Sequence, residues 1–210
     1  MAARTAEREQ AFTPRQQAVL TAALEALVEQ GDRFTMTEVA RRARCSKETL
    51  YKWFGDRDGL LTATVQWQAA KVRVPQLDRA RIDAGSLRES IEQLARDLLT
   101  TIGGTVSVTL NRLAITHAGP DPHELGGIML EHGPAAIRRR AKSLLEAGRG
   151  ANLLRFESSE DAYRTLFGLV VRDVQIRLLL GDRLKLAPTQ IERDAATATD
   201  QFLALFSRNH

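Results

Sequence analysis

The chain has 210 residues, of which 43% are hydrophobic and 27% charged, and its formal net charge is +4. This composition is typical of a globular protein with a substantial core, and it excludes fibrous and disordered chains. The sequence has no uninterrupted apolar run of about 20 residues, no signal peptide and only one cysteine. We therefore expect a cytoplasmic protein with no membrane segment, no internal disulfide and no cysteine-built metal site.

Helical periodicity begins close to the N-terminus. Thr13 is placed to cap a first helix that runs to about Glu29. Thr35 caps a second helix, and Glu38, three residues later, completes the spacing of a capping box. The sequence thus predicts two helices within its first 45 residues.

A short turn at residues 44–45 separates the second helix from a third. Ser46 caps this third helix, which ends near Phe54. Asp56 is placed to cap a fourth helix that continues to about Arg73, shortly before a proline. The three short helices form a small N-terminal unit, and the fourth connects it to the rest of the chain.

The remaining two thirds of the chain are also helical in pattern, with breaks at glycine and proline. Ser86 and Glu89 have the spacing of a second capping box. Helices are expected over residues 86–102, 106–117, 123–147 (one kinked helix or two shorter ones), 158–180 and 188–206. The predicted fold is therefore all-α, with an N-terminal arm (1–13), a three-helix unit (14–56), a connecting helix (57–74) and a C-terminal helical domain (75–210).

Basic side chains concentrate on the second and third helices. Six basic and two acidic residues lie between Arg41 and Arg57, so this segment carries a charge excess as large as that of the whole chain. A patch of this kind neutralises phosphates and releases counterions from nucleic acid. A solvated helix face that happens to be basic is the alternative interpretation.

Residues 35–54 have the pattern of a helix-turn-helix, in which the second helix is exposed enough to enter the major groove. The inner side of the two helices is apolar or small, with Val39, Ala40, Ala43, Leu50 and Phe54. The outer side of the second helix carries groups that meet phosphates or base edges, namely Lys47, Glu48, Thr49, Tyr51, Lys52 and Trp53. The pattern predicts a protein that binds double-stranded DNA.

The stretches 35–43, 46–54 and 56–61 resemble the DNA-binding domain of the TetR (tetracycline-repressor) family, and the match covers about residues 14–70. The resemblance implies phosphate contacts by Thr35, Tyr51 and Arg57. It also implies that Lys47, Thr49 and Lys52 face bases or backbone in the major groove. The complete set of DNA-binding candidates is Thr35, Thr37, Ser46, Lys47, Thr49, Tyr51, Lys52, Trp53 and Arg57.

Three positions depart from the family pattern. Arg44 stands where the turn usually has glycine, so the turn needs either a left-handed arginine or a different path. Glu48 stands where a small residue is common, and it either reads a cytosine amino group or repels phosphates. Trp53 replaces a tyrosine or histidine, which alters the contact with the DNA backbone.

The resemblance also implies a C-terminal domain that dimerises through its last two helices and encloses a ligand pocket. The pattern over residues 158–180 is apolar on nearly all sides, as expected of a helix between a core and a partner subunit; a wholly internal helix in a monomer is the alternative. We expect a homodimeric repressor that a small, largely apolar molecule releases from its operator, or else a regulator whose C-terminal domain senses a protein. Candidates for the effector pocket are Trp67, Ile102, Leu110, Leu113, His117, Met129, Phe167 and Arg172.

Other kinds of chemistry find little support. His117, His123 and His132 lie near acidic residues, but their spacing matches no helical ligand pair, so no metal site is predicted. Cys45 lies between basic residues that would suit a redox-sensing thiol, although its place in the turn favours simple packing. Residues 138–140, three arginines, are interpreted as a solvated helix face. We expect no enzyme activity and no cofactor, since the chain has neither a phosphate-binding glycine loop nor a nucleophile elbow.

Overall fold

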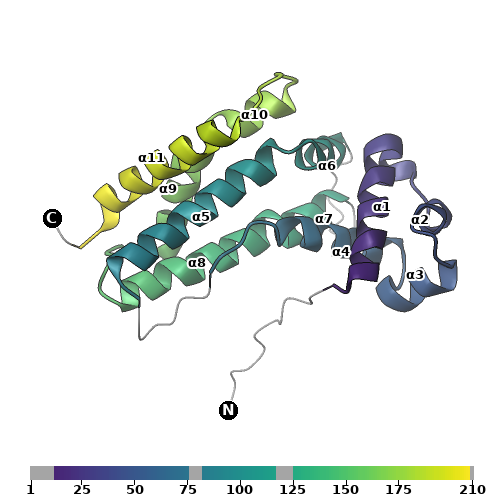
Figure 1. Ribbon diagram of the computed structural model, residues 1–210, viewed down its shortest axis with the longest axis horizontal. Helices are drawn as coiled ribbons and strands as arrows, with labels where there is room; N and C mark the ends of the chain where they lie inside the picture. Colours follow the sequence, from purple (N-terminus) through teal and green to yellow (C-terminus); the bar gives the residue numbers. More distant parts are fainter. Residues whose placement is uncertain (1–11, 76–81, 117–124, 209–210) are drawn as a thin grey trace, which may run out of the picture. The chain divides into compact units, whose positions relative to one another are not determined.

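The computed structural model describes residues 12–75, 82–116 and 125–208, which form helices joined by loops (Figure 1). The predicted all-α fold is confirmed, and over the described ranges the one extended pairing is an isolated bridge between Leu154 and Ser207. No single helix in these ranges is long and apolar enough to cross a membrane. The chain divides into two compact units, one that ends at Trp67 and one that begins at Gln68.

The N-terminal unit contains α1 (Pro14–Gln30), the single-turn η1 (Gly31–Arg33), α2 (Met36–Arg42), α3 (Lys47–Phe54) and most of α4 (Arg57–Ala69). Thr13 caps α1 as predicted, because its hydroxyl accepts the Gln16 N–H at 3.3 Å. Each of the four α-helices contributes buried apolar side chains, as does the residue after η1; they include Leu20, Leu27, Phe34, Val39, Leu50 and Leu60. Helix α1 packs against α2, and α2 packs against α3, which leaves the outer side of α3 exposed.

The C-terminal unit contains α5 (Ala84–Gly103), α6 (Thr105–Thr116), α7 (Leu125–His132), α8 (Pro134–Gly150), α9 (Ser159–Val171), α10 (Val174–Leu179) and α11 (Pro188–Phe206). Helix α5 packs against α11, α9 and α8, and α8 packs in turn against α9. Phe202 of α11 is fully buried in the core between them, and its ring lies 4.8 Å from that of Phe206. The burial of so large an apolar surface is the main source of this unit's stability.

Helix α8 approaches the start of α5 unusually closely at Gly148. A β-carbon built on Gly148 would lie 2.9 Å from Leu154 and 3.0 Å from Leu87, both of which are buried. Only glycine lets these two leucines pack directly on the backbone of α8. The position therefore sets the distance between α8 and α5.

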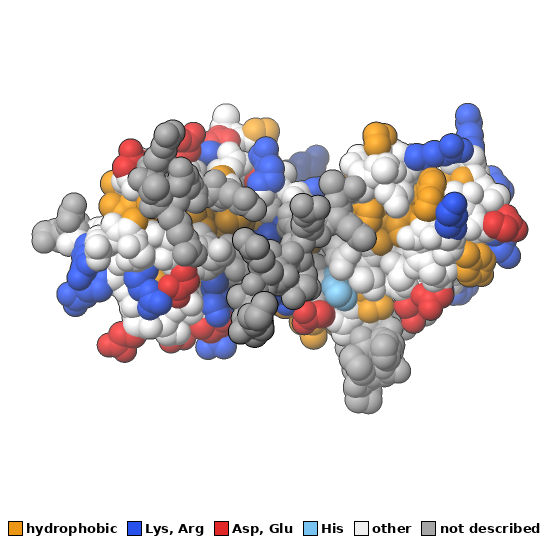
Figure 2. Space-filling model, turned by 90° about the horizontal axis from the view of Figure 1, so that it is seen from below, with side chains coloured by type: hydrophobic (Ala, Val, Ile, Leu, Met, Phe, Trp, Pro, Cys, Tyr) orange, Lys and Arg blue, Asp and Glu red, His pale blue; other side chains and the backbone are white. Residues whose placement is uncertain are grey.

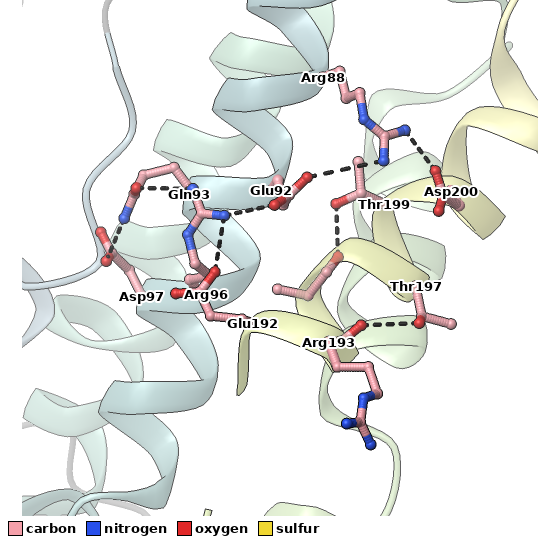
Figure 3. Close-up of polar contacts among 11 residues, drawn as sticks. Arg88, Glu92, Gln93, Arg96, Asp97, Glu192, Arg193, Thr197, Thr199 and Asp200 are labelled. Atoms are coloured by element: carbon pink, nitrogen blue, oxygen red, sulfur yellow. Dashed lines mark hydrogen bonds and ion pairs between the residues drawn. The ribbon is translucent and has the colours of Figure 1, made fainter. Parts of the chain in front are cut away.

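Ion pairs join α5 to α11 on the surface of the C-terminal unit (Figure 3). Arg88 binds Asp200 at 2.5 Å, and Arg96 binds Glu92 at 2.6 Å and Glu192 at 3.3 Å. Because these side chains are partly exposed, each pair contributes at most about 1 kcal/mol. The contacts fix the register of the two helices more than they stabilise them.

Two arginines hold the last turn of α4 and the segment after it within the C-terminal unit. Arg140 of α8 donates to the Ala69 carbonyl at 2.7 Å. Arg73 donates to the Asp97 carboxylate of α5 from its backbone N–H and its guanidinium, both at 2.9 Å. The predicted solvated face at residues 138–140 is therefore wrong for Arg140, which is half-buried and bound to the backbone.

Several predicted helix limits are corrected. Helix α4 ends at Ala69 rather than near Arg73, since the backbone turns at residues 70–72. Asp83 caps α5 in place of Ser86, whose N–H instead donates to the Asp83 carboxylate at 2.8 Å. Of the two possibilities for residues 123–147, the structure has two helices, α7 and α8, which meet at residues 133–134.

The single helix predicted over residues 158–180 is wrong, because it breaks into α9 and α10. Arg172 at the break has φ 46° and ψ −123°, which no helical residue adopts. Its backbone N–H still bonds to the Gly168 carbonyl at 3.1 Å, so α9 is closed at this point. Gly181, with φ 99°, follows the end of α10 and stops it as predicted.

Candidate DNA interface

Helices α2 and α3 begin at the predicted caps. The Thr35 hydroxyl accepts the Glu38 N–H at 3.2 Å, and the Ser46 hydroxyl accepts the Thr49 N–H at 3.2 Å. Each cap satisfies one backbone donor at a helix start, which fixes where the helix begins. Leu50, fully buried, anchors α3 to the core from its inner side.

The turn between α2 and α3 contains a left-handed arginine. Arg44 has φ 51°, its N–H donates to the Arg41 carbonyl, and the Cys45 N–H donates to the Ala40 carbonyl at 3.0 Å. This pair of hydrogen bonds is a Schellman motif, in which glycine is the usual left-handed residue. Of the two alternatives raised by the missing glycine, the structure therefore has the left-handed one, at a cost in backbone strain.

The exposed face of α3 consists of the residues that point away from the buried Leu50. At about 100° per residue, Glu48 and Lys52 each lie about 160° around the helix axis from Leu50, at the centre of the exposed face. Lys47 and Tyr51 lie on one flank of that centre, and both are exposed, as are Glu48 and Lys52. The helix thus presents a four-residue outer face with two lysines, one glutamate and one tyrosine.

The other flank of α3 is partly taken up by packing. Thr49 is half-buried, and its hydroxyl lies 3.1 Å from that of Ser46. Trp53 is half-buried and packs edge-on against Phe54, with 6.2 Å between ring centroids. Trp53 therefore has a structural contact and is only partly exposed.

The remaining DNA-binding candidates lie at the starts of helices. Thr35, Thr37 and Ser46 are exposed in the first turns or caps of α2 and α3. Arg57, in the first turn of α4, is half-buried, and its guanidinium lies 4.7 Å from the centre of the Phe34 ring. That cation–π contact holds the Arg57 side chain in place at the end of the turn after α3.

The basic patch is weaker than the sequence predicted, because two of its arginines are neutralised within the unit. Arg41 binds Glu38 at 2.8 Å, and Arg42 binds Glu38 at 2.6 Å and Glu29 at 2.5 Å. These contacts were not predicted, although Glu38 stands three and four residues before the two arginines, the spacing of helical ion pairs. Figure 2 shows basic and acidic side chains together on one face of the molecule.

The same contacts change two other expectations. The Glu38 side chain bonds to arginines rather than to the Thr35 N–H, so the predicted capping box is only half formed. Hydrogen bonds from Arg41 and Arg42 lower the pKa of Glu38 to about 2. Hydrogen bonds to Glu29 and Glu38 raise the pKa of Arg42. The cluster therefore stays fully ionised and joins α1 to α2.

Cys45 is half-buried in the turn, as the packing interpretation predicted. Burial raises the pKa of its thiol above the ordinary value, and the opposing effect of Arg15 is smaller. A reactive, redox-sensing cysteine needs the opposite shift. The environment of Cys45 therefore favours a packing role.

The effector candidates are spread over several helices. Ile102 of α5 is buried in the main core of the C-terminal unit, and Phe167 of α9 packs against that core with its ring 6.0 Å from that of Tyr163. Leu110 is buried on α6, whereas Leu113 on α6 and Met129 on α7 are half-buried. The structure thus brings Ile102 and Phe167 to one core.

The other effector candidates lie elsewhere. Arg172 is exposed, and its Nε donates to the Leu169 carbonyl at 3.3 Å. Trp67, half-buried on α4, belongs to the N-terminal unit. His117 lies outside the described residues, as does His123 of the histidine group considered for metal binding. The part of the chain that the structure describes holds no group of three or more metal-ligating side chains.

A helix-turn-helix with an exposed second helix, followed by a separate helical domain, defines a DNA-binding transcriptional regulator. Residues 19–64 match the family described as bacterial regulatory proteins of the tetR family, and residues 89–208 match the C-terminal domain of AefR-like transcriptional repressors. The chain therefore belongs to the TetR family of transcriptional regulators, which are DNA-binding proteins and not enzymes. No functionally curated protein matches the chain significantly.

Solved structures agree with this assignment over nearly the whole chain. A TetR regulator from Agrobacterium tumefaciens is 45% identical, with a TM-score of 0.78 and coverage of 94% of this chain and 97% of that one. A TetR-family regulator from Mesorhizobium loti is 25% identical, with a TM-score of 0.72 and coverage of 92% and 96%. The flavonoid-responsive regulator FrrA is 26% identical, with a TM-score of 0.67 and coverage of 93% and 98%.

Proposed function

We propose that this protein is a homodimeric repressor that binds a palindromic operator and is released from it by a small, largely apolar molecule. Each α3 would enter a major groove, and two such helices in a dimer would reach half-sites about one helical turn, ~34 Å, or a near multiple apart. Because its target is chromosomal DNA, we place the protein in the bacterial cytoplasm. The observation that carries the proposal is the exposed outer face of α3, with Lys47, Tyr51 and Lys52.

The DNA-binding role is tested by gel shift with the DNA upstream of the protein's own gene. We expect Lys47→Ala and Tyr51→Ala to weaken binding strongly, because each removes a group that meets the DNA backbone or a base edge. Lys185→Ala removes the same charge as Lys47→Ala from an exposed site in the C-terminal unit, so it serves as the matched control. The assignment of α3 as the recognition helix is wrong if both α3 variants bind as tightly as the wild type.

The dimer is supported by a glycine in the last turn of α9. Gly168 is exposed, and among the described residues nothing lies within 4 Å of a β-carbon built on it. Glycine costs a helix interior about 1 kcal/mol relative to alanine, and no contact described for this subunit requires it. Close approach of a partner subunit's backbone would explain the glycine, as happens where helices pack tightly.

Sedimentation of Gly168→Trp tests this interface. We expect the wild type to sediment as a dimer, at twice the 23.3 kDa of one chain, and the variant to shift toward the monomer at micromolar concentration. Gly150→Trp is the control, because Gly150 is also exposed at a helical site with nothing within 4 Å of its β-carbon. A wild-type monomer, or equal effects of the two substitutions, contradicts the proposal.

The effector is proposed to bind in the C-terminal unit, near the core side chains Ile102 and Phe167. FrrA, whose name calls it flavonoid-responsive, is 26% identical over nearly its whole length, so flavonoids are the first class to test. A ligand that binds only the folded state raises the free energy of unfolding, by about 2.7 kcal/mol at a concentration of 100 times its Kd. The melting temperature rises as a result. To act as an inducer it must also prefer the conformation that does not bind DNA.

The assay pairs thermal melting with release from DNA. We expect a flavonoid that raises the melting temperature to dissociate the gel-shift complex, and Phe167→Ala to weaken both effects. Stabilisation without release would identify a ligand that does not control DNA binding. If no small molecule has either effect, the alternative that the C-terminal domain senses a protein partner gains support.

A further inference from the structure

Glu48 occupies the centre of the face that α3 exposes. It lies about 160° around the helix from the buried Leu50, and its side chain is exposed. It also lies in the first turn of α3, which is the part of a recognition helix that meets base edges. If α3 enters the groove as proposed, Glu48 faces the groove floor rather than the phosphate walls.

Glu48 carries a negative charge that the structure does not neutralise. Hydrogen bonding to its own backbone N–H and, to a lesser degree, to the Ser46 hydroxyl lowers the pKa of Glu48. The other carboxylates of this region are engaged: Glu29 and Glu38 bind Arg42, and Asp56 accepts the Gly59 N–H at 2.8 Å. No ion pair to Glu48 occurs among the described side chains.

An ionised carboxylate can only accept hydrogen bonds, which restricts the bases it can meet. In the major groove, guanine presents two acceptors and thymine presents one acceptor and a methyl group, so both repel or ignore a carboxylate. Adenine offers one donor beside its N7 acceptor, an arrangement that suits the amide of Asn or Gln. Cytosine offers its N4 amino group without an adjacent acceptor on the same base.

We propose that Glu48 is a specificity-determining residue that selects a cytosine in each operator half-site by accepting a hydrogen bond from its amino group. The inference rests on the proposed function, since it requires α3 to be the recognition helix. Lys52 lies one turn further along the same line, ~6 Å from Glu48 along the axis. At ~3.4 Å per base pair, Lys52 should meet a guanine about two base pairs from that cytosine.

The test is selection of binding sites from a random duplex DNA library by the full-length protein, followed by competition binding with all four bases at each enriched position. For the wild type we expect one cytosine per half-site whose replacement weakens binding on the order of 10- to 100-fold. For Glu48→Ala we expect that position to accept all four bases within about threefold. For Glu48→Gln we expect a preference for adenine there.

Two controls separate the possible outcomes. Lys52→Ala should keep the cytosine and lose the neighbouring guanine, and Glu25→Ala, which removes an exposed glutamate from α1, should change neither. If the wild type enriches no sequence, the proposed function itself fails. Glu48 does not read cytosine if the wild type enriches a motif and Glu48→Ala shows the same base preferences, in which case Glu48 only stabilises α3. The proposal is also wrong if Glu48→Ala binds all four variants of the site more tightly by the same factor, in which case Glu48 only repels phosphates.

Discussion

Replacement of Arg44 by glycine should stabilise the N-terminal unit. Arg44 has φ 51° in the turn between α2 and α3, a conformation that costs a residue with a β-carbon about 1–2 kcal/mol. Glycine pays no such cost, but it gains about 0.5–1 kcal/mol of conformational entropy in the unfolded chain. The difference between the two costs predicts that Arg44→Gly raises the free energy of unfolding by about 0–1.5 kcal/mol, and by about 0.75 kcal/mol at their midpoints.

Tryptophan fluorescence is the appropriate probe, because the only two tryptophans, Trp53 and Trp67, both belong to the N-terminal unit. Guanidinium unfolding followed by this signal reports mainly on that unit, since Trp53 lies on α3 and Trp67 is the unit's last residue. Arg44→Ala removes the same charge but keeps a β-carbon at the strained position, so its free energy of unfolding should stay within about 0.5 kcal/mol of the wild type. Equal stabilities of the glycine and alanine variants would refute the strain argument.

Three further predictions concern caps, charge and packing. Ser46→Ala should cost the N-terminal unit about 1 kcal/mol by removing the cap of α3, whereas Ser46→Gly should cost only a few tenths, both by tryptophan fluorescence. The pKa of Glu38 is about 2 in the folded chain and 4.5 when unperturbed. Its contribution to the free energy of unfolding is therefore complete above about pH 4.5 and is lost as the pH falls toward 2. Acid unfolding should show that Glu38→Gln lacks this pH dependence, and an unchanged acid unfolding curve would contradict the ion-pair assignment. Gly148→Ala should destabilise the C-terminal unit by about 1–3 kcal/mol through overpacking, measured by circular dichroism, while Gly150→Ala, where the β-carbon meets nothing within 4 Å, should not.

The N-terminal unit was largely predictable from the sequence because its helices begin at local signals. A cap such as Thr13, Thr35 or Ser46 acts through a backbone N–H three residues away, so the sequence alone contains both partners. The inner and outer sides of α3 likewise follow from helical periodicity around Leu50. Charge was harder to predict, since Glu29 meets Arg42 from another helix, thirteen residues away.

The C-terminal unit was less predictable because its breaks depend on backbone conformation and tertiary contacts. The residues around Arg172 are mostly apolar and favour one continuous helix, yet the backbone breaks there with a positive φ. The role of Arg140 could not be read from a run of three arginines, because its partner is a main-chain carbonyl 71 residues away. Helix periodicity places side chains on faces but does not say which faces meet.

The arginine contacts at the end of α4 have a mechanical consequence. Arg140 and Arg73 tie residues 69–73 to helices of the C-terminal unit, while α4 runs without interruption across the division between the units to Arg57. Twelve residue steps make the helix a lever ~18 Å long. A swing of about 10° at Ala69 would displace Arg57 by ~3 Å, close to the ~3.4 Å rise of one base pair. We therefore expect a rearrangement at residues 69–73 to be passed along α4 to Arg57, one of the proposed DNA contacts.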